Sequence, residues 1–220
     1  MASSPATSFV IRSREYNSGS DFNGSDDNEV IPSQYVKRIW RERATVSEDG
    51  SRTIRFINKT SADRTVLYCA TESGNKLTVW PGATPNKGAP VGGIEWSSQG
   101  RNFDRSMTSL GNKSSAFKDM IKRASVFSPS RIFVNPDTDV EYKWKVLLEG
   151  DNPIFPDATY RTLHKKNIAH PLATTSRLVG RDGEQGDEAY PIYIAEDALP
   201  LEPWIIATTM ILEIFDRYKQ

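Results

Sequence analysis

The segment PLEPWIIATTMILEIFDRYKQ, residues 200–220, decides the fold because so many apolar side chains have to be buried. Only ten residues lie between Glu202 and Glu213, whereas a membrane-spanning helix needs about 20 apolar residues. A helix at a membrane surface would keep one polar face. Apolar side chains from Trp204 to Phe215 instead cover every side of the first three turns, which is typical of a buried helix. We therefore expect a core helix and no transmembrane span.

The residues before this helix, from Arg52 onward, read as short strands separated by turns. The run VEYKWKV, 140–146, alternates apolar and polar side chains, as an antiparallel strand with one face in water does. Other β-prone runs lie at 53–58, 65–71, 76–80, 91–96, 130–134, 158–164, 174–180 and 190–195. The predicted fold class is mainly β (α+β): a closed antiparallel β-barrel around a central hydrophobic C-terminal helix.

Three other regions complete this interpretation. The stretch 113–124, KSSAFKDMIKRA, has apolar residues at helical spacing and predicts a second helix. The stretch 33–46 is compatible with either a helix or a strand. Residues 17–29 are rich in Ser, Gly, Asn and Asp, which is typical of a flexible linker, and residues 8–16 could add a strand to a sheet edge. We therefore expect an N-terminal arm and linker at 1–50 and one barrel domain at 51–220.

Charge and cysteine content narrow the function classes. The 28 basic and 28 acidic side chains cancel, so there is no global attraction to nucleic acid or to an anionic membrane. The single cysteine, Cys69, excludes an internal disulfide and suits a reducing compartment. Residues 1–10 do not have the basic and apolar regions of a secretory signal. We expect a cytoplasmic protein that can also lie at the periphery of a membrane.

Four pieces of the sequence together resemble an uncharacterised fungal domain family, which is placed near the tubby C-terminal, LURP-one and phospholipid-scramblase superfamily. These are the hairpin TVLYCATESGNKLTVW, the strand VGGIEW, the run AFKDMIKRASVFSPSRIFVNPDTDVEYKWKV, and the closing LEPWIIATTMILEIFDRYK. The resemblance covers most of the chain from Arg52 to Gln220 but not residues 1–50 or the polar stretch 151–171. It implies a β-barrel with a central helix and an association with lipid, and it brings no established activity.

Few residues suggest chemistry. His164 and His170 are five apart and have no third metal ligand near them in sequence, so ordinary surface histidines are the better interpretation. Cys69 reads as a packed thiol rather than a nucleophile. Asp137 and Asp139 have the alternation of a calcium loop without the rest of its pattern, and a turn is favoured. We expect no cofactor, no metal and no catalytic residue.

One uneven distribution of charge lies between residues 101 and 131. Its basic residues are the candidate lipid-binding or anion-binding set: Arg101, Arg105, Lys113, Lys118, Lys122, Arg123 and Arg131. Near an anionic lipid surface each contributes about 1 kcal/mol, although a solvated helix face is the favoured interpretation of these residues. No aromatic stacking set accompanies them, so nucleic acid is not the expected partner.

The predicted function is a non-enzymatic binding or scaffold protein that associates with anionic phospholipid or phosphoinositide headgroups. Two alternatives stay open. One is a small-ligand or enzymatic site in a pocket at the barrel rim. The other is a protein-interaction module in which Phe9, Val10 and Ile11 of the N-terminal arm add to the sheet edge of a partner.

Overall fold

The structure is a computed structural model that describes residues 34–60, 64–97, 103–126, 128–147, 159–177 and 189–218. These residues belong to the second of two contact units, 31–220, and the predicted arm strand at 8–16 lies outside them. The elements are β1 (Lys37–Arg41), β2 (Thr45–Val46), β3 (Arg52–Asn58), β4 (Val66–Ser73), β5 (Lys76–Pro81), β6 (Gly92–Glu95), η1 (Phe103–Arg105), β7 (Met107–Leu110), β8 (Lys113–Ala116), α1 (Phe117–Met120), β9 (Ile121–Arg123), β10 (Arg131–Val134), β11 (Glu141–Leu147), β12 (Thr159–Lys165), β13 (Ala173–Arg177), β14 (Tyr190–Ile194), η2 (Glu196–Leu201) and α2 (Glu202–Tyr218).

The fourteen described strands form one antiparallel sheet. Thirteen of them follow a single path in the order β8-β7-β6-β5-β4-β3-β1-β14-β13-β12-β11-β10-β9, and β2 pairs with β3 beside it. Strand β1 joins two meanders, because one of its edges pairs with β3 and the other with β14. The stretch that was compatible with helix or strand is therefore a central strand. The sheet begins at Lys37, ahead of the domain boundary predicted between residues 50 and 51, and Ile39 of β1 is fully buried.

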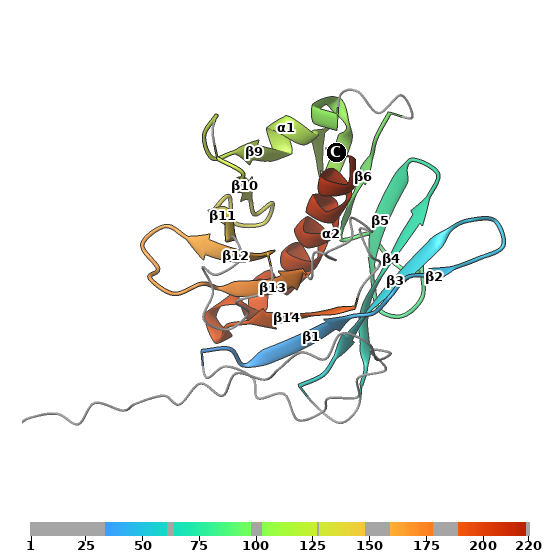
Figure 1. Cartoon of the computed structure of the whole chain (residues 1–220), viewed down its shortest axis with the longest axis horizontal. Coiled ribbons are helices and arrows are strands. Elements are labelled where there is room, and N and C mark those ends of the chain that lie inside the picture. The colour runs from blue at the N-terminus through green and yellow to red at the C-terminus, as the bar shows by residue number, and fades with distance from the viewer. Residues whose placement is uncertain are drawn as a thin grey trace, which may run out of the picture. The chain divides into compact units, whose positions relative to one another are not determined.

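The sheet curves around α2 but does not close, so the predicted closed barrel is wrong (Figure 1). Among the described residues the two end strands, β8 and β9, do not pair with each other. Directions alternate along a path of thirteen strands, so β8 and β9 run the same way and could close the sheet only as a parallel pair. Parallel neighbours need a crossover of about a dozen residues or more. Only the four residues of α1 connect these two strands.

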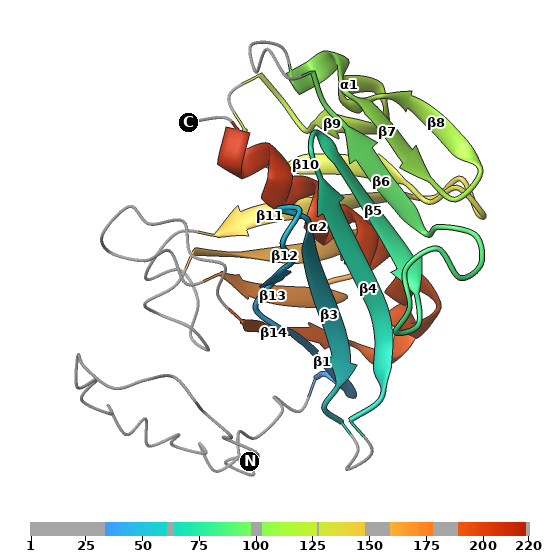
Figure 2. The ribbon, with the colours of Figure 1, turned by 90° about the vertical axis from the view of Figure 1, so that its right-hand side faces the viewer.

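Helix α2 lies inside the curve of the sheet, between the wall β3–β8 and the wall β9–β14 (Figure 2). On one side Trp144 Nε1 of β11 donates to Thr208 Oγ1 over 2.9 Å. On the other, a Cβ added at Gly92 of β6 would lie 3.1 Å from the Cβ of Ala207, so the missing side chain lets strand and helix approach. Eight helix residues are fully buried: Ile205, Ile206, Ala207, Thr208, Met210, Ile211, Leu212 and Ile214. The mainly β class and the buried helix are confirmed.

The helix predicted at 113–124 is wrong except for one turn. Residues 113–116 pair with β7 and residues 121–123 pair with β10, leaving α1 as a four-residue turn between two strands. A helix of this length is marginal by itself, whereas each sheet edge offers ready hydrogen-bond partners. Phe117 and Ile121 are buried, as the apolar pattern indicates, but Ile121 has an extended backbone, with φ −125°.

Candidate functional site

Five arginines gather where α2 ends, and we call this set the arginine end. Each contacts a side chain that belongs to, or binds, the last turns of the helix. Its members are Arg41 of β1, Arg52 of β3, Arg131 of β10, Arg161 of β12 and Arg217 of α2 itself. The negative end of a helix dipole favours cations, which gives one physical reason for this placement.

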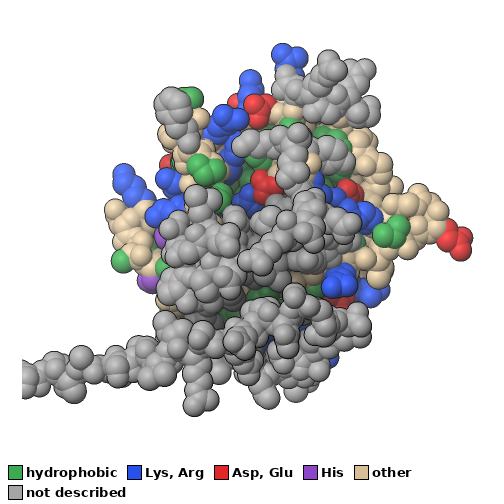
Figure 3. All heavy atoms as spheres, viewed as in Figure 1, with side chains coloured by type: hydrophobic (Ala, Val, Ile, Leu, Met, Phe, Trp, Pro, Cys, Tyr) green, Lys and Arg blue, Asp and Glu red, His purple; other side chains and the backbone are tan. Residues whose placement is uncertain are grey.

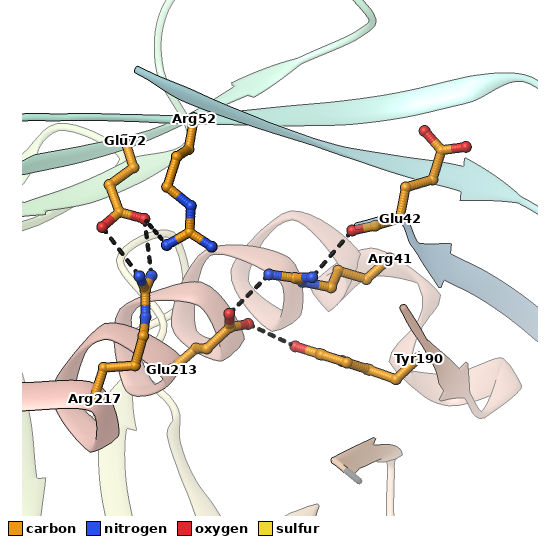
Figure 4. A network of polar contacts seen from close by, with 7 residues as sticks. All are labelled: Arg41, Glu42, Arg52, Glu72, Tyr190, Glu213 and Arg217. Carbon is orange, nitrogen blue, oxygen red and sulfur yellow. Dashed lines mark hydrogen bonds and ion pairs between the residues drawn. The ribbon is translucent and has the colours of Figure 1, made fainter. Parts of the chain in front are cut away.

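The first ion pair of the arginine end is buried (Figure 4). Arg41 is 0% exposed, and its Nη2 donates to Glu213 Oε1 over 2.8 Å. The hydroxyl of Tyr190, on β14, donates to the other oxygen of Glu213 over 3.1 Å. The guanidinium of Arg41 also lies 5.4 Å from the centre of the Tyr190 ring. One carboxylate of α2 therefore links β1 to β14.

A second group surrounds Glu72 of β4 (Figure 4). Arg52 Nη1 donates to Glu72 Oε2 over 3.2 Å, and Arg217 donates to both oxygens over 3.1 and 2.9 Å. Arg161 pairs with Asp216 of α2. Within the arginine end, four of the five guanidinium groups, all except that of Arg131, thus pair with the carboxylates of Glu72, Glu213 and Asp216. Most of these side chains are largely shielded from water.

Arg131 differs from the other four. It is 4% exposed, and its guanidinium lies 4.3 Å from the ring centre of Phe215 and 5.5 Å from that of Phe117. Its Nε is buried without a hydrogen-bond partner, and within the described residues the side chain has no ion pair. Burial lowers the pKa of Arg131, and neighbouring Arg123 lowers it further. Arg131 therefore does not share the exposed surface expected for the candidate set.

Four residues of the candidate set do lie exposed on neighbouring elements, and we call them the basic ridge: Arg105 of η1, Lys118 of α1, and Lys122 and Arg123 of β9. The ring centres of Phe103 and Phe117 are 5.1 Å apart, which holds η1 against α1. Figure 3 shows Lys and Arg side chains gathered where Figure 1 places α1 and β9. Asp104 and Asp119 are the acidic residues of the same elements.

Two members of the candidate set lie elsewhere. Lys113 is at the start of β8, and its Nζ is 2.6 Å from Asp139 in the turn before β11. The two side chains are 47% and 80% exposed, so this pair contributes little to stability. Arg101 lies outside the described residues.

Sequence reasoning missed Arg41, Arg52, Arg161 and Arg217, which are widely separated along the chain. A local signal was nevertheless present. Each strand arginine continues an apolar alternation by one step, as in Ile39–Arg41 or Arg161–Leu163, and so occupies an inward position at or near a strand end. The spatial order of the strands was needed to bring these positions together.

The histidines and the cysteine lie apart from the arginine end. Burial and two lysines lower the pKa of His164, on β12, to about 4. Its Nε2 hydrogen-bonds with the Thr162 hydroxyl over 2.9 Å. His170 is exposed and lies 3.2 Å from Asp197. Cys69 is fully buried, and burial raises the pKa of its thiol, which disfavours the reactive thiolate.

The acidic turn before β11 uses both of its aspartates within the protein. Asp137 accepts a hydrogen bond from Trp204 Nε1 over 3.2 Å, and Asp139 pairs with Lys113. Asp139 has a positive φ of 55°, which suits a turn. In the described part of the chain no group of three or more His, Cys, Asp or Glu side chains is arranged to hold a metal ion.

One helix of the described chain, 196–217, has the length and composition to cross a membrane, with a mean hydropathy of 1.4. The protein itself buries 83% of its apolar window, and core helices often pass the same test. Comparison with protein-family models, with curated proteins and with solved structures found no match.

Proposed function

We propose that this chain is a non-enzymatic binding or scaffold protein that associates with anionic lipid headgroups through the basic ridge. The observation that carries the proposal is the placement of Arg105, Lys118, Lys122 and Arg123 on three neighbouring elements, all exposed. Against the two acidic residues of these elements, the ridge keeps an excess positive charge on an otherwise neutral chain. Positive charge concentrated in this way attracts anionic membranes in a salt-dependent manner.

The likeness to the tubby and scramblase-like group is part of the same proposal. A single antiparallel sheet curved around an apolar helix supports it, as do the sequence pieces that fall on β4–β6, β9–β11 and α2. A sheet that is open between β8 and β9 departs from the closed barrel of that group.

Binding rather than catalysis fits the chemistry of the ridge. Its side chains are exposed cations without an adjacent nucleophile, and the buried thiol of Cys69 is disfavoured as a thiolate. The alternative that uses Phe9, Val10 and Ile11 concerns residues outside the described part of the chain and stays a prediction.

Co-sedimentation of the full chain with phosphatidylcholine vesicles, with and without phosphatidylserine, tests the proposal. We expect binding only to the anionic vesicles. The variant Arg105→Glu, Lys118→Glu, Lys122→Glu removes three contributions of about 1 kcal/mol each, so its affinity should fall by about 100-fold.

The matched control reverses two lysines and one arginine that are exposed away from the ridge: Arg55→Glu, Lys87→Glu and Lys166→Glu. Both variants change the net charge equally, so only the ridge variant should lose binding. An equal loss of vesicle binding in the two variants would show that net charge, and not the ridge, determines binding, and it would contradict the proposal. Absence of binding by the unaltered chain would also reject the proposal.

A further inference from the structure

The buried guanidinium of Arg131 has no ion pair with the described residues, and its Nε has no acceptor among them. Arginine carries five N–H donors and no acceptor of its own, and it keeps its charge even when buried. Within the described residues, Arg131 contacts the faces of Phe215 and Phe117 but has no ion pair, and its Nε has no hydrogen-bond partner. Aromatic faces attract a cation but satisfy no N–H group. A buried charge in this state is costly unless an anion completes it.

The aromatic support leaves the guanidinium ready for such an anion. Phe117 and Phe215 are stacked with ring centres 5.0 Å apart, and Phe103 meets each of them edge-on. The Arg131 guanidinium lies over the Phe117 and Phe215 rings of this cluster. A planar guanidinium held in this way can present its N–H edge to two oxygens at once.

A second arginine stands beside the first. Arg123 of β9 is the register partner of Arg131 on β10, so the two side chains leave the sheet on the same face. Asp216, the α2 carboxylate whose charge acts on Arg131, is already paired with Arg161. Asp104 of η1 is the other carboxylate whose charge acts on Arg131. Two guanidinium groups against one available carboxylate favour an anion that carries more than one charge.

We propose that Arg131 and Arg123 bind a phosphate group, with Arg131 donating a pair of hydrogen bonds and Arg123 supplying the second positive charge. Phosphate fits better than a single carboxylate because it is dianionic near neutral pH and offers several acceptor oxygens. The site goes beyond the proposed function, since it needs no membrane. A free phosphate, a soluble phosphomonoester and a lipid phosphate share this chemistry.

Thermal unfolding of the full chain in sodium phosphate, compared with sodium chloride of equal ionic strength, tests the site. We expect phosphate to raise the midpoint in a saturable way, because a ligand that binds only the folded state stabilises it. Arg131→Lys keeps the charge but loses the two-pronged geometry, so its phosphate affinity should fall at least about tenfold. Arg123→Gln changes an exposed residue, is expected to fold, and should also weaken phosphate binding by about tenfold.

Two controls make the result decisive. Arg55→Gln removes an exposed charge from the outer face of β3 and should leave the phosphate response unchanged. Asp104→Asn removes a competing anion and should tighten phosphate binding. If Asp104→Asn instead destabilises the protein without tighter binding, Asp104 is the natural partner of Arg131 and the proposal fails. Equal responses in the unaltered chain, Arg131→Lys and Arg123→Gln would indicate an adventitious ion only and would also overturn it.

Vesicles separate the two sources of phosphate and keep the two proposals distinguishable. A response to inorganic phosphate without vesicle binding supports the Arg131 site and counts against the lipid function alone. Vesicle binding that depends on Lys118 and Lys122, with no response to inorganic phosphate, supports the lipid function and rejects the Arg131 site.

Discussion

The ion pair between Arg41 and Glu213 is expected to be strongly coupled. Arg41 is 0% exposed and the side chain of Glu213 is 11% exposed, so neither charge can be fully solvated if its partner is removed. Removing one member of such a buried pair costs about 3–5 kcal/mol. For a domain of this size that corresponds to a fall in melting temperature of roughly 6–20 °C. Glu213→Gln makes this change while keeping an oxygen that can accept from Tyr190.

A double-mutant cycle isolates the coupling. Arg41→Met removes the cation, and the double variant Arg41→Met, Glu213→Gln removes both charges. Because the double variant removes both charges of this pair, we expect it to be more stable than the sum of the single losses predicts, by about 1.5–3 kcal/mol. Urea unfolding at neutral pH, followed by tryptophan fluorescence, gives the four free energies.

Glu42→Gln is the matched control for the charge change. Arg41 Nη1 donates to the backbone oxygen of Glu42 over 3.0 Å, and the Glu42 carboxylate points away from it (Figure 4). We expect this variant to lose less than about 0.5 kcal/mol. Additive single losses, or a loss in Glu213→Gln as small as that in Glu42→Gln, would refute the reasoning.

Three further predictions concern the core, the sheet and pH. Thr208→Val leaves the buried Trp144 Nε1–H without an acceptor and should cost about 1–3 kcal/mol in urea unfolding. Gly93→Ala places a Cβ 2.4 Å from the backbone oxygen of Leu77 and should therefore lower the melting temperature markedly. An unchanged melting temperature would contradict the close approach of β6 to β5. Since the pKa of His164 is about 4 in the folded protein, against 6.5 ordinarily, its neutral form stabilises the fold above about pH 6.5, and this contribution is lost as the pH falls toward 4. His164→Gln should flatten the melting temperature between these pH values, and an unchanged slope would contradict the assignment.

The parts of the fold that were predictable are those with a local cause. The apolar surface around α2 has only one place to be buried, and the alternation along β11 marks a strand whatever its neighbours are. The segment 113–124 was mispredicted because its helical spacing competes with pairing to the strands on either side of it in the sequence, β7 and β10. The closed barrel was also mispredicted. Whether the two end strands can pair depends on the number and direction of all strands along the sheet, which no single stretch of sequence shows.

The candidate site divides in the same way. The basic ridge could be predicted because Lys118, Lys122 and Arg123 are close in sequence. The arginine end could not, because Arg41 and Glu213 meet only after β1 has paired with β14. Arg131 was correctly grouped with the basic residues around it, but its burial was not predicted. Its side chain lies on the inner face of β10, and the sequence alone does not say which face of that strand meets water.

Because α2 follows every strand of the sheet in the sequence, the inward side chains emerge from the ribosome long before the helix that covers them. About 160 residues separate β1 from α2, which is roughly 8–30 s of synthesis at 5–20 residues per second. During most of that interval one edge of β1 is unpaired, because its partner strand β14 has not been synthesised. The nascent chain therefore exposes an apolar concave face and unpaired strand edges until α2 is made, and surfaces of this kind make incompletely folded chains prone to aggregation.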